Sequence, residues 1–357
     1  MEIGTTHANR GERSTGYLEV TELPTGGPER VPIGIVAGEE AGPTLWVTAA
    51  IHGDEVTALA VAQDAFTTLD PASLRGTFVC VPTTNPAGLR RNERTSYYHD
   101  DDPNRFFPDA NHDSVRPPRV QEVIDRRLYE AITDSADALV DLHTAQVGSV
   151  PFTIRDRVLY GERRDREEAE ALASDLDRIA EAFGLPVVTE YGAEEYVEEG
   201  LHRSTAGSVL NEAGIPAITP ELGGHSVVEE DMRAAGLTGV FRCLVELDML
   251  DSVPGPTAAA GPGSDSPVSY PVKRAVGPHT DRGGLVRHRV EPGDVIEADE
   301  VVAEVVSPHG DVLSTVESDH DGYVLARKEG IAVYENDPLY SLAVRDSDEL
   351  VVARPGD

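Results

Sequence analysis

A histidine and a glutamate three residues apart, His52 and Glu55, follow an apolar run in the sequence LWVTAAIHGDE. The run from Leu45 to Ile51 predicts a buried strand, and Gly53 marks the turn that ends it. We expect a helix from Asp54 to Leu69, because the helix dipole favours an acidic residue in the first turn. An imidazole at a strand end and a carboxylate on the first helical turn can bind one cation, so this pair predicts half of a metal site.

Two more polar residues occur at predicted strand ends further along the chain. His143 follows the strand Ala138 to Leu142, and Glu221 follows the strand Ile215 to Thr219. Ligands of open α/β sheets bind beyond the carboxyl ends of the strands, so we expect both side chains to lie near His52. Two histidines and one carboxylate suit a catalytic zinc ion, which keeps its fourth position for water. The predicted ligands of one Zn²⁺ per chain are His52, Glu55 and His143.

The remaining polar residues predict the chemistry of a metal-dependent hydrolase. Glu221 is the candidate general acid/base, which would take a proton from water and pass it to a leaving amine. Arg94 is the candidate that stabilises a developing oxyanion, and Asn104 with Arg105 would bind a substrate carboxylate, which matches the two-pronged guanidinium. Zinc is the expected ion, although cobalt or manganese would accept the same ligands.

Each of these residues has a structural alternative. His52 and Glu55 could belong to a solvated loop and a helix start, and His143 could be a hydrogen-bonded core histidine. Glu221 could pair at a strand end without catalytic work. Asn104 and Arg105 could instead hold the long loop in place through salt bridges to the acidic run Asp100 to Asp102. Arg90 and Arg91 compete with Arg94 for its role.

Strand and helix patterns alternate through the first 250 residues, which predicts an α/β domain with a mixed, largely parallel sheet flanked by helices. Further expected strands are Gly16 to Leu23, Val31 to Val36, Thr77 to Val81, Phe152 to Ile154 and a segment near Val187. Further expected helices are Val120 to Ser135, Arg163 to Phe183, a short one before Gly214, and Met232 to Leu250. A polar loop from Thr83 to about Arg119 carries the arginines. We expect residues 1–253 to form the catalytic domain.

The composition then changes. Residues 254–267 are rich in proline, glycine and alanine, which predicts a linker. Residues 268–357 contain short β-branched runs cut by glycine, proline and aspartate, which predicts a smaller all-β domain similar to the barrel-sandwich domains of lipoyl and biotinyl carriers. A carrier needs a modifiable lysine at a hairpin tip, and neither Lys273 nor Lys328 lies in such a turn.

The net charge of −34 predicts an acidic, solvated surface like that of proteins from salt-loving archaea. Such a surface would repel a phosphate backbone, so we expect no nucleic-acid partner. No apolar stretch is long enough to span a bilayer and no secretory signal is visible, so we expect no membrane partner and a cytoplasmic location. Cys80 and Cys243 lie in apolar patterns and are expected in the core.

The ordered set of motifs resembles the succinylglutamate desuccinylase/aspartoacylase family, a branch of the zinc carboxypeptidase fold. The motifs are His52-Gly53-Asp54-Glu55, Asn85-Pro86, Asn104-Arg105, Asp141-Leu142-His143 and Glu221-Leu222-Gly223-Gly224. The resemblance covers nearly the whole chain and implies the same three zinc ligands, the same acid/base and the same substrate-binding residues. It also implies hydrolysis of the amide bond of a small N-acyl amino acid, with the C-terminal unit narrowing the entrance. Arg203 and His225 are further candidates to line the pocket.

Three hypotheses follow for the function. The first is a zinc-dependent deacylase of small N-acylated, carboxylate-bearing substrates. The second is a metallocarboxypeptidase that acts on peptides with the same chemistry. The third is a metal-binding protein without catalysis. The sequence does not determine the acyl group, the amine or the oligomeric state of the protein. A homo-oligomer is one of the states that it leaves open.

Overall fold

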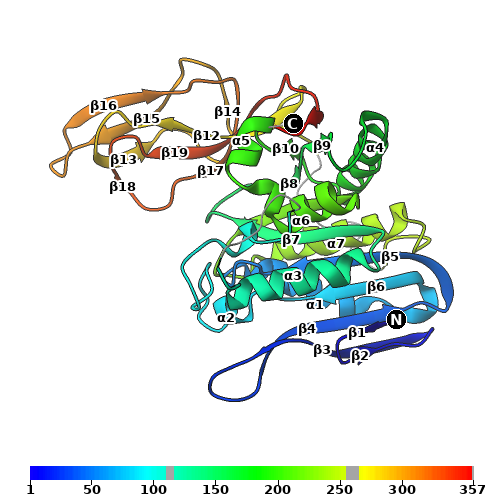
Figure 1. Cartoon of the computed structure of the whole chain (residues 1–357). Coiled ribbons are helices and arrows are strands. Elements are labelled where there is room, and N and C mark those ends of the chain that lie inside the picture. Colours follow the sequence, from blue (N-terminus) through cyan, green and yellow to red (C-terminus); the bar gives the residue numbers. More distant parts are fainter. Residues whose placement is uncertain (110–115, 255–264, 356–357) are drawn as a thin grey trace.

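The computed structural model describes residues 1–109, 116–254 and 265–355 (Figure 1). The strands of the first part are β1 (Glu2–Ile3), β2 (Thr6–His7), β3 (Glu12–Glu22), β4 (Pro28–Ala37), β5 (Glu40–Ala49), β6 (Arg75–Val81), β7 (Ala138–Ala145), β8 (Phe152–Arg155), β9 (Val158–Tyr160), β10 (Val187–Thr189) and β11 (Ala217–Gly224). The helices are α1 (Val56–Thr68), α2 (Pro86–Leu89), α3 (Val120–Thr133), α4 (Arg166–Phe183), α5 (Ala193–Glu198), α6 (Thr205–Ser208) and α7 (Glu230–Glu246). No helix within these ranges is both long and apolar enough to cross a membrane.

A mixed sheet forms the centre of the molecule. From β10 to its N-terminal edge the strand order is β10-β8-β11-β7-β5-β6-β4-β3. The neighbouring pairs among β6, β5, β7 and β11 are parallel. Strand β4 is antiparallel to β6, β3 is antiparallel to β4, and β8 is antiparallel to β11. The α/β prediction, with a mixed sheet flanked by helices, is therefore confirmed.

Helices cover both faces of this sheet, which explains why its inner strands are largely buried and carry apolar residues on both faces. Helix α7 packs against both α1 and α4 along the sheet, and α3 crosses the opposite side (Figure 1). Residues 45–49 of β5 are all buried, and Trp46 donates from its indole nitrogen to the Ser135 hydroxyl beyond α3 (3.1 Å). Cys80 and Cys243 are buried free thiols, as the sequence predicts.

The C-terminal region is all-β, as predicted. Its strands are β12 (Val272–His279), β13 (Gly284–His288), β14 (Val295–Ile296), β15 (Val301–Val306), β16 (Val312–Glu317), β17 (Gly322–Arg327), β18 (Ala332–Val333), β19 (Pro338–Arg345) and β20 (Val351–Ala353). Strands β13, β15, β16 and β18 form a separate four-stranded sheet, and β14-β17-β19-β12 continue the central sheet. Valine and leucine side chains of both sheets share a core of their own.

The central sheet is continuous across the predicted domain boundary. Strand β12 pairs in parallel with β10 through Thr189 and Lys273, and β20 returns to pair in parallel with β9. Most of the predicted linker, residues 255–264, lies outside the described residues. The boundaries at 253 and 268 stay a prediction, but strands before and after them in the sequence are hydrogen-bonded neighbours, namely β10 with β12 and β9 with β20.

Several predicted element ends were wrong by a few residues. Helix α1 starts at Val56, so Glu55 is its N-cap residue and not part of its first turn. Strands β7 and β11 extend past their predicted ends, because their ladder continues to the pair Gly224 and Ala145. Helix α4 starts at Arg166, where Asp165 caps it by accepting from the Glu168 amide (2.9 Å). The polar loop contains α2 and a 3₁₀ turn at Pro103–Arg105.

A buried arginine ties the C-terminal segment to the first part of the chain. The side chain of Arg157 is 0% exposed and donates to the Tyr191 carbonyl (3.0 Å), the Glu349 carbonyl (3.1 Å) and both oxygens of Asp346 (3.1 and 3.2 Å). Removing one partner of a buried ion pair leaves an uncompensated charge, which costs several kcal/mol.

We predict that Asp346→Asn lowers the free energy of unfolding by about 3 kcal/mol, because the Arg157 guanidinium loses its buried counter-charge. Urea denaturation in molar salt would measure the change. The matched control is Asp251→Asn, which removes an ion pair of Arg75 with a 91% exposed carboxylate and should leave the transition unchanged. Equal effects of the two substitutions would contradict the assigned role of Arg157.

Candidate metal centre

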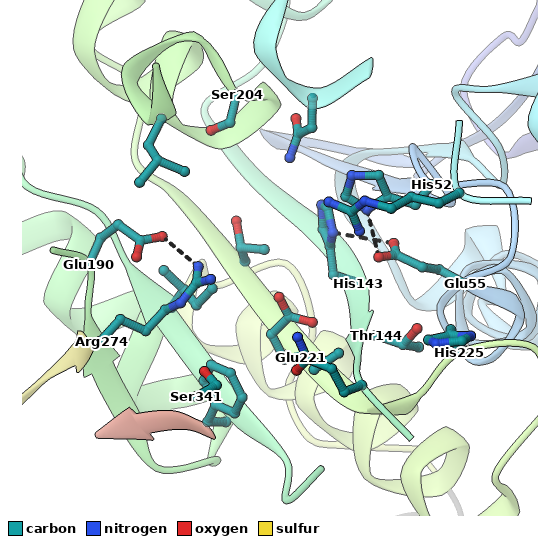
Figure 2. Close-up of a pocket in the computed structure, with 18 of the residues that line it drawn as sticks. His52, Glu55, His143, Thr144, Glu190, Ser204, Glu221, His225, Arg274 and Ser341 are labelled. Carbon is teal, nitrogen blue, oxygen red and sulfur yellow. Dashed lines mark hydrogen bonds and ion pairs between the residues drawn. The ribbon is translucent and has the colours of Figure 1, made fainter. Parts of the chain in front are cut away.

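Three side chains predicted as metal ligands converge in the structure (Figure 2). His52 Nδ1 lies 2.7 Å from Glu55 Oε1, and His143 Nδ1 lies 3.2 Å from Glu55 Oε2. One ligand atom from each of the three residues lies within 4.8 Å of the other two. All three residues are at most 4% exposed. Two imidazole nitrogens and a carboxylate therefore face one small buried volume.

The strand-turn-helix geometry places the first two of these side chains. Strand β5 ends at Ala49, and Ala50 has a positive φ of 49°, which turns the chain out of the sheet. Gly53 then packs so closely on α2 that an added Cβ would lie 2.1 Å from the Gly88 carbonyl carbon, so only glycine fits there. Glu55 follows as the N-cap residue of α1. The turn thus points His52 and Glu55 to the same side.

The sheet places the third ligand. His143 lies within β7, directly opposite Glu221 of β11 in the parallel ladder. The next strand on the other side is β5, whose Thr48 is the partner of Asp141. Because alternate strand residues share a face, Asp141 and His143 point the same way.

A carboxylate holds the outer ring nitrogen of each histidine. His52 Nε2 lies 3.1 Å from Asp102 Oδ1, and His143 Nε2 lies 3.0 Å from Asp141 Oδ2. Asp141 in turn accepts from the Thr48 hydroxyl (2.6 Å). A carboxylate on the far nitrogen orients a ligating imidazole and raises its basicity, and this arrangement is typical of histidines that bind metal.

The charges of the centre are strongly coupled. Burial alone would raise the pKa of Glu55, but His143 and His52 hold it down at about 2. Burial would lower the pKa of both histidines, and the neighbouring carboxylates, Glu55 first, raise it instead. Burial would also raise the pKa of Asp102, whereas its contacts with His52 and Arg94 keep it well below its usual range. Glu55 is thus held ionised, as a metal ligand must be.

These residues fit a zinc ion. Both inner imidazole nitrogens have their outer nitrogens anchored, the carboxylate is ionised, and two histidines with one carboxylate are a common ligand set of catalytic zinc. The set is incomplete for a structural site, which usually closes with four protein ligands.

Glu221 faces the same cavity as the candidate metal ligands (Figure 2). The cavity has a volume of about 360 Å³. The Oε2 atom of Glu221 is buried and has no hydrogen-bond partner among the described residues. Burial raises the pKa of this carboxyl, with Glu55 adding to the rise, while His143 and Arg274 oppose it. An unpartnered carboxyl with a raised pKa beside a metal site is suited to proton transfer.

The three loop residues predicted for substrate also line the cavity. Arg94 Nη2 donates to Asp102 Oδ2 (2.9 Å), and about half of the Arg94 side chain remains exposed. Asn104 Oδ1 accepts from the Thr205 amide (2.8 Å) and hydroxyl (3.0 Å), while Arg105 donates to the Glu199 carbonyl (3.1 Å). The structure therefore brings all seven predicted site residues to one cavity.

The competing arginines are engaged elsewhere. Arg90 forms a two-pronged ion pair with the buried Glu29 (2.7 and 2.9 Å), and Arg91 pairs with Glu93 at the surface (2.7 Å). Neither of these two arginines lines the cavity, nor does Arg203. His225 does, and its Nε2 lies 2.7 Å from Glu329 Oε1 of the C-terminal region.

Several residues that line or support the site were not singled out in the sequence. Asp156 and Glu190 follow β8 and β10, and Arg274 lies within β12, more than 50 residues after Glu221. Asp102 belongs to an acidic run whose members look alike in the sequence. A search for polar residues directly after every predicted strand would have found Asp156 and Glu190, but Arg274 lies in mid-strand and only the fold reveals it.

Comparison with known proteins gives a family and a fold. The family model of the succinylglutamate desuccinylase/aspartoacylase catalytic domain matches residues 41–247. No curated protein matches the sequence. Several solved structures share the fold at low identity. They include a succinylglutamate desuccinylase from Silicibacter sp. TM1040 (20% identity, TM-score 0.71, 97% of this chain and 100% of that chain), a succinylglutamate desuccinylase/aspartoacylase from Rhodobacter sphaeroides (22%, 0.72, 94% and 96%), and the ectoine utilization protein EutE from Ruegeria pomeroyi (18%, 0.72, 96% and 100%).

The anchoring of His143 leads to a test of the metal centre. We predict that Asp141→Asn weakens zinc binding by about 10- to 100-fold, because the imidazole loses the carboxylate that orients it. Competition with a chromogenic chelator would give the dissociation constant. Asp125→Asn is the matched control: Asp125 is buried and burial raises its pKa well above the usual range, so an amide resembles its neutral form. An unchanged zinc affinity in Asp141→Asn would refute the predicted role.

Proposed function

The chain belongs to the succinylglutamate desuccinylase/aspartoacylase family, and on this premise we propose that it is a zinc-dependent amidohydrolase that removes the acyl group from a small N-acyl amino acid. The observation that carries the proposal is that Glu221 lines the same cavity as three converging metal ligands, with a buried Oε2 atom that has no hydrogen-bond partner among the described residues. A structural metal site would have no use for that carboxyl, whereas hydrolysis requires a base near the attacking water.

The residues of the chain take complementary roles in this reaction. His52, Glu55 and His143 would hold zinc, which when bound makes a water molecule more acidic and polarises a carbonyl oxygen. Glu221 accepts the proton that the attacking water loses, and it donates that proton to the nitrogen of the amide as the C–N bond breaks. A carboxyl with a raised pKa can perform both steps, because it is a strong enough base to take the proton and acidic enough to return it.

The loop residues would stabilise and orient the substrate. Arg94 is held by Asp102 at the rim of the metal site and keeps donors free for the oxygen that gains charge as the amide carbon becomes tetrahedral. Arg105 is fixed by the carbonyls of Asn104 (2.7 Å) and Glu199 (3.1 Å), which supports a fixed position for a substrate carboxylate.

The cavity favours a small substrate over a peptide. A volume of about 360 Å³ is at the lower end of small-molecule sites. Glu329 and Ser341 of the C-terminal region close part of the cavity wall, where a carboxypeptidase needs room for a chain. We therefore propose the deacylase over the carboxypeptidase.

Assays should be made at high salt, because a chain with a net charge of −34 repels itself in dilute buffer.

Our prediction of a cytoplasmic protein is supported by its two buried free cysteines. Metal analysis of the purified protein would identify the native ion.

We predict that Glu221→Gln keeps its metal content and loses at least about 1,000-fold in kcat on N-acyl amino acids, because the amide cannot transfer the proton. Metal analysis and steady-state kinetics on N-acyl amino acids and dipeptides would measure both quantities. Wild-type turnover of dipeptides alone would reject the deacylase, and unchanged hydrolysis in the variant would reject Glu221 as the acid/base.

We predict that the two loop arginines differ in kinetic effect. Arg94→Ala should lower kcat about 100- to 1,000-fold with a smaller effect on KM, because it removes a donor used mainly in the transition state. Arg105→Ala should mainly raise KM, because it removes ground-state binding of the carboxylate. Arg91→Ala, on the same loop but outside the cavity, is the control and should match the wild type. The opposite pattern would exchange the two assignments.

A further inference from the structure

The cavity wall opposite the metal ligands contains two acids and one arginine that the reaction does not use. Arg274 Nη1 donates to Glu190 Oε2 at 3.1 Å, and Figure 2 shows this pair across the cavity from His52, Glu55 and His143. Asp156 lines the same cavity. The Asp156 and Glu190 residues are 5% and 3% exposed, and the side chain of Arg274 is 26% exposed.

Each of the two acids has an oxygen without a partner. Asp156 Oδ2 and Glu190 Oε1 are buried and form no hydrogen bond among the described residues, although Tyr196 bonds to the Asp156 carboxyl and Arg274 bonds to the other Glu190 oxygen. A buried acceptor left without a donor has lost its hydrogen bonds to water without replacement, and the cost is larger when the acceptor is charged. Two such oxygens in one cavity wall therefore call for donors from a bound molecule.

The charges at this end of the cavity specify which donor fits. Arg105 and Arg274 carry two positive charges, and Asp156 and Glu190 carry two negative charges when both are ionised. An N-acyl amino acid with one carboxylate and one ammonium group leaves that sum at zero. A substrate with two carboxylates would bring it to −2, in a place with little water to screen the charge.

The titration of Asp156 supports this choice. Burial raises the pKa of Asp156 well above its usual range and the charge of Glu190 adds to the rise, while the hydrogen bond from Tyr196 and the charges of Arg274 and Arg105 oppose it. A positive group bound beside Asp156 would reverse the effect and keep the carboxylate ionised. Arg105, the proposed carboxylate-binding residue, lines the same cavity as Asp156, as two groups of one amino acid require.

We propose that Asp156 and Glu190, with Glu190 oriented by Arg274, form a subsite that binds a positively charged side chain, so that the substrate is an N-acyl diamino acid. The inference rests on the proposed function and names its substrate class. The side-chain ammonium donates to Asp156 Oδ2 and Glu190 Oε1, and Arg105 holds the α-carboxylate. An ammonium group offers three donors, enough for both oxygens.

The test is a panel of substrates with equal shape and different charge. The Nα-acetyl derivatives of 2,4-diaminobutyrate, ornithine and lysine are compared with the derivatives of norvaline, norleucine and 2-aminoheptanoate, which replace the ammonium by methyl, and with those of aspartate and glutamate. We expect kcat/KM for the best cationic substrate to exceed its neutral counterpart about 10-fold or more, as charge-assisted hydrogen bonds imply. An equal or higher value for the neutral or acidic substrates would overturn the proposal.

Two variants identify the residues that cause the preference. Asp156→Asn should reduce the cationic preference to about threefold or less, and Glu190→Gln should in addition favour the acidic substrates, because Arg274 loses its counter-charge. Glu195→Gln is the matched control: Glu195 is exposed on α5 and does not line the cavity, so the same loss of charge should leave the preference in place. Equal loss in all three variants would reduce the effect to long-range electrostatics and reject the subsite.

Calorimetry separates the subsite from the proposed function. If the zinc-loaded wild type hydrolyses no N-acyl amino acid, the proposed function fails, and titration with Nα-acetyl-ornithine and Nα-acetyl-norleucine still tests the wall. Tighter binding of the ornithine derivative, lost in Asp156→Asn, would support the cation subsite without hydrolysis. Hydrolysis of every substrate without regard to side-chain charge would uphold the proposed function and refute the subsite alone.

Discussion

The register of β7 between β5 and β11 is the constraint on which the site depends. In this register Asp141 lies opposite Thr48, and His143 lies opposite Glu221. A shift of one residue would turn His143 and Asp141 to the other face of the sheet, away from Glu55. Burial of β7 on both faces fixes the register, because the apolar residues between these polar ones then fill the core. The packing of the sheet and the geometry of the candidate metal ligands therefore have one cause.

Local sequence patterns predict the parts of the site that depend on local geometry. The turn after β5 carries His52 and Glu55 within four residues, so its chemistry is visible without a fold. His143 and Glu221 required one further argument, that ends of parallel strands gather at one edge of a sheet. The ends of α1, β7 and β11 were less predictable, because ladder pairs and caps between distant residues decide where an element stops.

Arg274 shows where this kind of prediction ends. It lies in mid-strand in a region of different composition, and it reaches the cavity because β12 pairs with β10. No pattern in the sequence around it indicates that pairing, which is a single bridge between Thr189 and Lys273. Only two of the 30 basic residues are lysines, Lys273 and Lys328. This preference for arginine has a structural meaning, since Arg157 and Arg105 each use several donors on backbone carbonyls in a fixed geometry that a lysine cannot match.

The way in which β12 joins the sheet bears on how such an enzyme can diversify. The candidate metal ligands and Glu221 lie on strands or turns of the first part, while the opposite wall takes Arg274 from β12, which lies between β10 and β19 in the same sheet. If Arg274 takes part in substrate selection as we propose, mutations in β12 would alter what the cavity selects and leave the proposed catalytic residues in place. New substrate specificities could therefore evolve by mutations in the last quarter of the gene, while the proposed catalytic residues stay constant.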